Sequence, residues 1–161
     1  EARISLLILA SSNKRRITEE WIINLGDYLE NENISSTAIM SLNALLVCHK
    51  RTVCIISDEN ILLIIRAVLN NQSLSGRNAT ILYLDIGRYF GSMGYSEDLV
   101  IEMGELAIKE SPDSIDSRIY LARVYLILGE MDHAREQITN ARTMDKYNVF
   151  KEDIDKLENK L

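Results

Sequence analysis

The chain has 161 residues, of which 47% are hydrophobic and 26% are charged, the ordinary composition of a globular protein. Its net charge of −6 disfavours a nucleic acid partner, because phosphate binding needs a concentrated excess of lysine and arginine. One proline and seven glycines, set among many helix-favouring residues, predict an all-α fold.

The chain opens with an apolar run, Ile4–Ala10, followed by the basic cluster Lys14–Arg16. The run is far shorter than the about 20 residues that span a bilayer, and no signal-peptide cleavage pattern follows it. We expect it to dock on the core as a first helix or strand. The alternative is a segment that flanks a membrane helix.

Three helices are expected before residue 77. The first begins at Thr18, the second covers Ser36–His49, and the third runs from a Ser57 N-cap to about Asn71. Apolar residues recur on one face of each helix. These inward positions are Trp21, Leu25, Tyr28 and Leu29, then Ile39, Leu42, Leu45 and Leu46, then Ile61, Leu62, Ile65 and Leu69.

Four further helices and a closing helix are expected in the rest of the chain. Their predicted ranges are about Asn78–Met93, Ser96 to Pro112, Ile115–Leu128, Asp132–Asp145, and from Asn148 to the end. Gly94 and Gly129 stand where left-handed helix caps belong. The closing helix places Phe150, Ile154, Leu157 and Leu161 on one face, with a charged face opposite, as a terminal cap requires.

Two stretches of this region repeat each other with a period of about 34 residues. The first, residues 80–114, carries Ile86, Gly87, Phe90, Gly94, Ala107 and Pro112. The second, residues 115–148, carries Leu121, Ala122, Tyr125, Gly129, Ala134 and Ala141. Small residues suit close helix contacts, aromatic residues fill the space beside them, and glycine closes the turn between two helices.

On these residues, positions 80–146 resemble the tetratricopeptide repeat. The resemblance implies a right-handed α-α superhelix of helical hairpins that binds a protein or peptide. We therefore expect one helical-repeat domain, 1–161. Its expected parts are N-terminal helices with a degenerate repeat in 1–77, repeats in 80–114 and 115–148, and a capping helix in 149–161.

The resemblance places a concave groove along the first helix of each repeat, where Arg88 and Arg123 take equivalent positions. Two guanidinium groups can grip one carboxylate or phosphate. Apolar contact in this groove is expected from Leu84, Ile119, Leu126 and Ile127. The alternative is that each arginine pairs with a nearby acid, for example Arg88 with Asp85.

Cys48 and Cys54 are the only cysteines, and a loop of five residues separates them. Such a loop can bring them to bridging distance, so a disulfide in an oxidising compartment and two free thiols in a reducing one are both open. With His49 they make a poor zinc site, because a fourth ligand is missing. No metal or other cofactor is expected.

A second resemblance covers most of the chain. Leu42–Leu45, the cysteine pair, Ala67–Asn71, the two repeats and the closing Asp145–Tyr147 follow the order of the hydrophilic C-terminal region of O-antigen ligase and polymerase-type membrane proteins. The resemblance implies a non-catalytic accessory domain of a membrane-embedded glycan ligase or polymerase, on the periplasmic face of the inner membrane.

Other functions are weighed against this one. A free-standing cytoplasmic adaptor or secretion chaperone, with a peptide in its concave groove, is the alternative. The basic cluster Lys14–Arg16 favours the cytoplasmic side. An enzyme is not expected, because no nucleophile–base pattern or glycine-rich phosphate loop occurs in the sequence.

Overall fold

The chain folds into helices. The computed structural model describes residues 27, 29–30, 36–50, 56–71 and 73–161, and within these residues every regular element is a helix. The predicted all-α class is therefore confirmed. Of the helix predicted from Thr18, only residues 27, 29 and 30 are described; they are helical, and Leu29 is buried as predicted. The apolar run Ile4–Ala10 lies outside the described residues. The chain divides into two compact units, Glu1–Asn78 and Ala79–Leu161.

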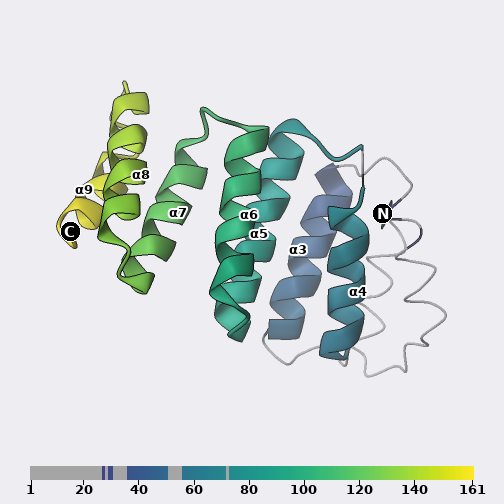
Figure 1. Cartoon of the computed structure of the whole chain (residues 1–161). Helices are drawn as coiled ribbons and strands as arrows, with labels where there is room; N and C mark the ends of the chain where they lie inside the picture. The colour runs from purple at the N-terminus through teal and green to yellow at the C-terminus, as the bar shows by residue number, and fades with distance from the viewer. Residues whose placement is uncertain (1–26, 28, 31–35, 51–55, 72) are drawn as a thin grey trace. The chain divides into compact units, whose positions relative to one another are not determined.

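The first unit contains α3 (Ser36–Lys50) and α4 (Asp58–Leu69), which are labelled in Figure 1. All four residues predicted to point inward from α3 are buried. In α4, Ile61 and Ile65 are buried as expected, whereas Leu62 and Leu69 are half-buried. Ser57 caps α4 as predicted, because its hydroxyl accepts a hydrogen bond from the Asn60 N–H at 3.3 Å.

Asn71 ties the turn after α4 to a distant part of the same unit. Its side-chain amide donates a hydrogen bond of 2.5 Å to the carbonyl oxygen of Leu29, and its side-chain oxygen accepts one of 2.9 Å from the Ser73 N–H. Asn71 is buried, and a buried amide without partners would destabilise the fold. The asparagine thus fixes where the chain leaves α4.

The second unit holds α5 (Gly76–Met93) from Ala79 onward, followed by α6 (Glu97–Glu110), α7 (Ile115–Leu128), α8 (Met131–Met144) and α9 (Lys151–Glu158). Successive helices pack together, α6 on α7 and α7 on α8, and α9 contacts both α7 and α8. Each boundary falls within three residues of its predicted position. Pro112 lies just after α6, where a helix cannot continue.

The two hairpin turns of this unit have the same geometry. Gly94 and Gly129 adopt left-handed backbone angles, with φ of 75° and 78°. After each glycine, the next N–H donates to a carbonyl five residues back, from Tyr95 to Phe90 at 3.1 Å and from Glu130 to Tyr125 at 2.9 Å. Both glycines therefore end their helices as predicted, in the turn that glycine favours because it lacks a Cβ.

Helix α9 closes the second unit over α7 and α8. Ile154 and Leu157 are buried with Ile119, Ala122, Ile138 and Ala141 in one hydrophobic cluster. Arg142 of α8 forms ion pairs with Asp155 and Glu158 of α9. Leu161 does not join this face, contrary to the prediction. The helix ends at Glu158, and the Leu161 side chain is 40% exposed.

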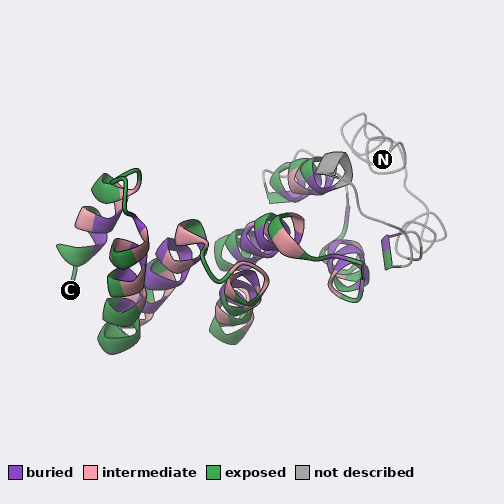
Figure 2. Cartoon of the chain, turned by 90° about the horizontal axis from the view of Figure 1, so that it is seen from above, coloured by how far each residue is buried: buried purple, intermediate pink, exposed green. Residues whose placement is uncertain are grey.

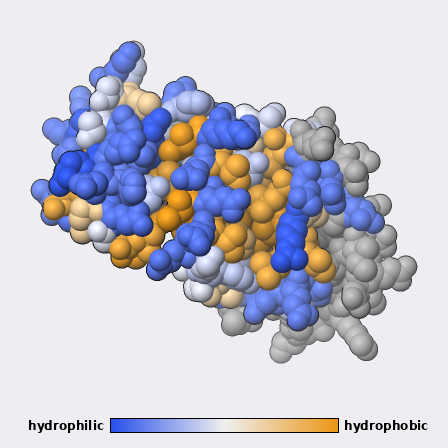
Figure 3. Space-filling view, in the orientation of Figure 1, coloured by the Kyte–Doolittle hydropathy of each residue, from blue (hydrophilic) through white to orange (hydrophobic). Residues whose placement is uncertain are grey.

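The turn before α9 is held by Asp145. Its two carboxylate oxygens accept hydrogen bonds from the N–H groups of Val149 and Phe150, each at 2.8 Å. Figure 2 shows the burial of each helix, with α8 and α9 keeping exposed outer faces. Most of the surface over α8 in Figure 3 is hydrophilic, as a terminal element needs.

The buried alanines of α8 give a stability test. Ala134 and Ala141 are 0% and 1% exposed. We expect Ala141→Leu to lower the free energy of unfolding by about 1–3 kcal/mol, because a larger side chain overpacks the contact. Thr143→Leu, on the exposed face of α8, is the control and should change it by less than about 0.5 kcal/mol. Equal denaturant midpoints for the two variants would contradict the packing described here.

Candidate functional site

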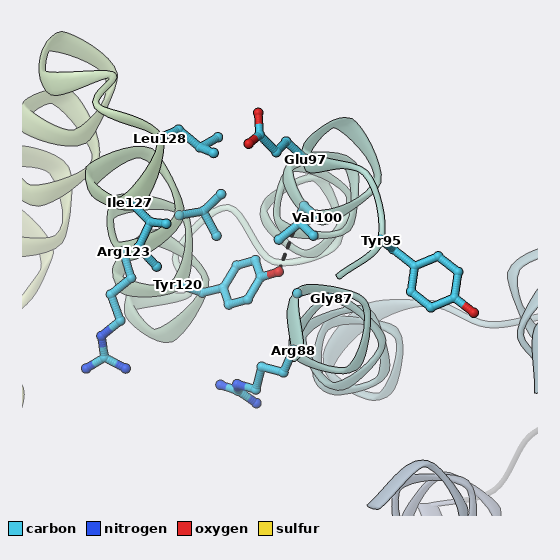
Figure 4. A pocket seen from close by; sticks show the side chains of 11 residues that line it. Gly87, Arg88, Tyr95, Glu97, Val100, Tyr120, Arg123, Ile127 and Leu128 are labelled. Atoms are coloured by element: carbon cyan, nitrogen blue, oxygen red, sulfur yellow. Dashed lines mark hydrogen bonds between the residues drawn. The ribbon is translucent and has the colours of Figure 1, made fainter. Parts of the chain in front are cut away.

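A pocket of about 580 Å³ opens among α5, α6 and α7 in the second unit. Figure 4 shows it from close by. Most of its lining is apolar, with charged groups at the edges. The lining residues are Gly87, Arg88, Gly91, Tyr95, Glu97, Val100, Tyr120, Arg123, Val124, Ile127 and Leu128.

The floor of the pocket is the ring of Tyr120, which reaches from α7 toward α5 and α6. Its hydroxyl donates a hydrogen bond of 3.1 Å to the carbonyl oxygen of Val100. Gly87 makes room for this hydroxyl. A Cβ at that position would collide with the Tyr120 hydroxyl and would stand only 3.0 Å from Cβ of Met103.

A second glycine brings α7 close to α6. A Cβ added at Gly104 would lie 2.6 Å from two side-chain carbons of Leu121 and 3.0 Å from a ring carbon of Tyr120. Real Cβ atoms do not approach other atoms so closely. Tyr120 and Leu121 therefore pack into space that Gly87 and Gly104 leave empty, and this packing sets the depth of the pocket.

Burial keeps Tyr120 neutral. Removal of its phenol from water raises the pKa of Tyr120 to about 12, and the nearby positive charge of Arg88 offsets a small part of that rise. The neutral phenol is the form that donates to Val100. Tyr120 therefore serves here as a packing and hydrogen-bonding group at neutral pH.

Arg88 and Arg123 both lie at the mouth of the pocket, on one side of it in Figure 4, with Glu97 across from them. Each already has an acidic partner, as the alternative interpretation of the sequence expected. Arg88 pairs with Asp85 at 3.0 Å, and Arg123 pairs with Asp153 of α9 at 2.8 Å. Their side chains remain 56% and 52% exposed, so both guanidinium groups still face solvent.

The apolar residues predicted for the groove divide into two groups. Ile127 lines the pocket and is 85% exposed. Leu84 and Ile119 do not line it, because they are only 4% and 5% exposed. Ile119 turns instead into the cluster beneath α8 and α9. Leu126 is half-buried and lines a smaller neighbouring pocket.

Sequence reasoning missed Tyr120 and the α6 residues Glu97 and Val100. The missed signal is the pair of glycines at 87 and 104 within otherwise regular helices. A glycine costs about 1 kcal/mol relative to alanine in a helix interior, so its presence there indicates close packing by another group. The group that fills the space cannot be identified from spacing alone.

The cysteines, possible metal sites and possible membrane-spanning helices add no further candidate site among the described residues. The choice between a disulfide and two free thiols at Cys48 and Cys54 lies outside the described residues, since residue 54 and the side chain of residue 48 are not described. Among the described residues, no group of three or more histidine, cysteine or acidic side chains is placed to hold a metal ion. None of the described helices combines the length and apolar character that membrane crossing requires.

The chain has no significant match among protein-family models, curated proteins or solved structures. The pocket must therefore be interpreted from its own geometry. It presents exposed cations and apolar surface in one open recess, an arrangement suited to binding an anionic, partly apolar segment.

The space beside Gly87, which Tyr120 fills and which we call the glycine slot, predicts opposite effects of two similar α5 substitutions on stability. We expect Gly87→Ala to lower the free energy of unfolding by about 1–2 kcal/mol, because the displacement of Tyr120 outweighs the gain in helix propensity. Gly91→Ala is the control, since its Cβ would meet Val100 at 3.8 Å, an ordinary contact. It should leave stability unchanged or raise it by up to about 1 kcal/mol. Chemical denaturation measures both, and a stabilised Gly87→Ala would contradict the slot.

Burial of Tyr120 predicts that the wild type and Tyr120→Phe exchange their order of stability as pH rises. The folded protein holds the pKa of Tyr120 near 12, above the ordinary 10.0, so its stabilising effect is complete below pH 10 and is lost as pH rises toward 12. Tyr120→Phe should be less stable by about 1 kcal/mol at pH 8, because a hydrogen bond is lost.

At pH 11.5 the wild type should have lost about 2 kcal/mol through this group, so the order of the two proteins should reverse. Urea denaturation at both pH values measures the difference between the proteins. Because both proteins contain the same other tyrosines and lysines, the effect of their titration on stability cancels in this difference. A gap between the two proteins that stays constant with pH would mean that Tyr120 is exposed to water in the folded state.

Proposed function

We propose that the second unit is a non-catalytic peptide-binding module built of tetratricopeptide-like hairpins. One observation carries the proposal. Arg88 and Arg123, from equivalent positions of two sequence repeats, lie at the mouth of the same apolar pocket. The partner is a peptide segment with a carboxylate beside aliphatic side chains. The carboxylate binds the arginines, and the aliphatic groups enter between Val100 and Ile127.

The repeated hairpins support the architectural part of the proposal. The turns at Gly94 and Gly129 share one backbone geometry, and each follows a helix that contributes an arginine to the pocket. Each repeat is therefore a hairpin with the same internal turn, as expected of the units of a right-handed superhelix with one open inner face. The pocket would lie on that face.

Charge supports an acidic partner. The chain carries a net charge of −6, yet two of the three charged residues lining the pocket are arginines. The Arg123–Asp153 pair is about half exposed on both sides, and such a pair contributes only about 0–1 kcal/mol. A ligand carboxylate can therefore replace Asp153 at little cost, and bidentate contact with guanidinium adds orientation. Arg88 is 56% exposed as well, although its partner Asp85 is only 12% exposed.

In the wider setting, we propose an accessory extramembrane domain of a membrane-embedded glycan ligase or polymerase. The support for this is the order of sequence features from Leu42 to Tyr147. The alternative is a cytoplasmic adaptor or secretion chaperone. Membrane-spanning segments encoded upstream of Glu1 would support the first proposal, and a start codon close to Glu1 would support the second.

Selection from a displayed library of random seven-residue peptides tests the binding function with the whole 161-residue chain. We expect enriched peptides to combine an acidic group with aliphatic residues. Arg88→Glu with Arg123→Glu should weaken them at least about tenfold, because each charge-assisted hydrogen bond contributes about 1.5–3 kcal/mol.

Arg135→Glu is the matched control for this loss. Arg135 is also an exposed arginine, paired with an acid three residues before it at 3.0 Å, but it does not line the pocket. Its variant should bind the selected peptides like the wild type. Equal affinity for the double variant and the wild type would reject the pocket as the binding site.

A further inference from the structure

A second pocket of about 270 Å³ adjoins the first along α7. It is lined by Arg123, Leu126, Ile127, Leu157 and Lys160. Arg123 and Ile127 line both pockets, so the two recesses meet along these side chains. The two pockets therefore lie side by side along α7, and we call them together the groove of the second unit.

The second pocket repeats the chemistry of the first. Its two charged lining residues, Arg123 and Lys160, are both cations, and its other three are aliphatic. Along the whole groove, three cations and one acid, Glu97, line the two pockets. This charge is complementary to an acidic peptide, which carries its own aliphatic residues into the apolar recesses.

Arg123 stands where the pockets meet, and its present partner is Asp153 in the first turn of α9. The two residues are 30 positions apart in the sequence and lie on different helices, and the Arg123 guanidinium donates to a carboxylate oxygen of Asp153 at 2.8 Å. Asp153 lines neither pocket, but its carboxylate occupies one side of the guanidinium group that both pockets share. It holds the place at Arg123 that a peptide carboxylate would take.

We propose that Asp153 is an internal competitor for the peptide, and that the bound peptide spans both pockets. A carboxylate of the peptide displaces Asp153 from Arg123, and the next part of the peptide enters the second pocket, where Lys160 receives a further acid. This inference rests on the proposed peptide-binding function and adds the length of the site, a second acidic position and the residue that sets the affinity.

The test is titration calorimetry of the full chain with seven-residue peptides selected on the wild type and, separately, on Asp153→Asn. The neutral amide releases Arg123, so the affinity of a given peptide should rise about two- to fivefold. Asp132→Asn is the matched control, because Asp132 also lies in the first turn of its helix and pairs with an exposed arginine at 3.0 Å. It should leave the affinity unchanged.

Lys160→Glu tests the second pocket and should weaken peptides with two acidic residues about fivefold, while peptides with one acidic residue keep their affinity. Lys151→Glu is its control, since Lys151 is an exposed lysine at the start of α9, the helix that precedes Lys160, and lines neither pocket. Asp153→Ser gives a second way to release Arg123 if the amide variant melts early.

The outcomes distinguish a failure of the Asp153 and Lys160 inference from a failure of the proposed peptide-binding function. Tighter binding by both Asp153 variants, with the Lys160 effect confined to doubly acidic peptides, supports the inference. Peptides that bind through Arg88 and Arg123 but do not respond to Asp153 or Lys160 overturn it and leave the proposed function standing. Selections that yield no peptide on either protein overturn both.

Discussion

The insertion of Tyr120 between α5 and α6 is the constraint on which the second unit depends. Its hydroxyl bonds to Val100, and its ring occupies space that exists only because Gly87 and Gly104 lack side chains. Since Leu121 packs against Gly104 at the same place, two consecutive residues of α7 fix how closely it approaches α6. This contact sets the position of α7, against which α8 and α9 then pack.

The same contact creates the site. Because the Tyr120 ring closes the floor, Ile127 of α7 remains open to solvent above it and the two arginines remain at the rim, whereas Val100 of α6 lines the recess but is only 9% exposed. A binding surface of this kind needs a rigid base, since an ordered recess loses less conformational entropy when a partner binds. The packing of the second unit and the shape of the proposed binding site thus depend on one arrangement of side chains.

The arginines of the proposed binding site already have acidic partners. Both hold internal acids at hydrogen-bonding distance while about half of each side chain faces solvent. The Arg123–Asp153 pair is exposed on both sides and exchanges partners readily, because water and salt screen much of its attraction, whereas Asp85 beside Arg88 is only 12% exposed. In the proposed function, Asp153 therefore sets the threshold that a peptide carboxylate must exceed, and α9 would take part in recognition as well as in closing the second unit.

Local chemistry in the sequence determined the helices, because capping serines, left-handed glycines and one-sided apolar spacing act over a single turn. The sequence also places Arg88 and Arg123 at equivalent positions, because the period of the repeat can be recognised from residue spacing alone. Only the tertiary structure decided that Leu84 and Ile119 are buried, that Leu161 leaves the closing helix, and that Tyr120 fills the space left by two glycines. Those outcomes depend on which helix packs against each helix face, and the packing residues are far apart in the sequence.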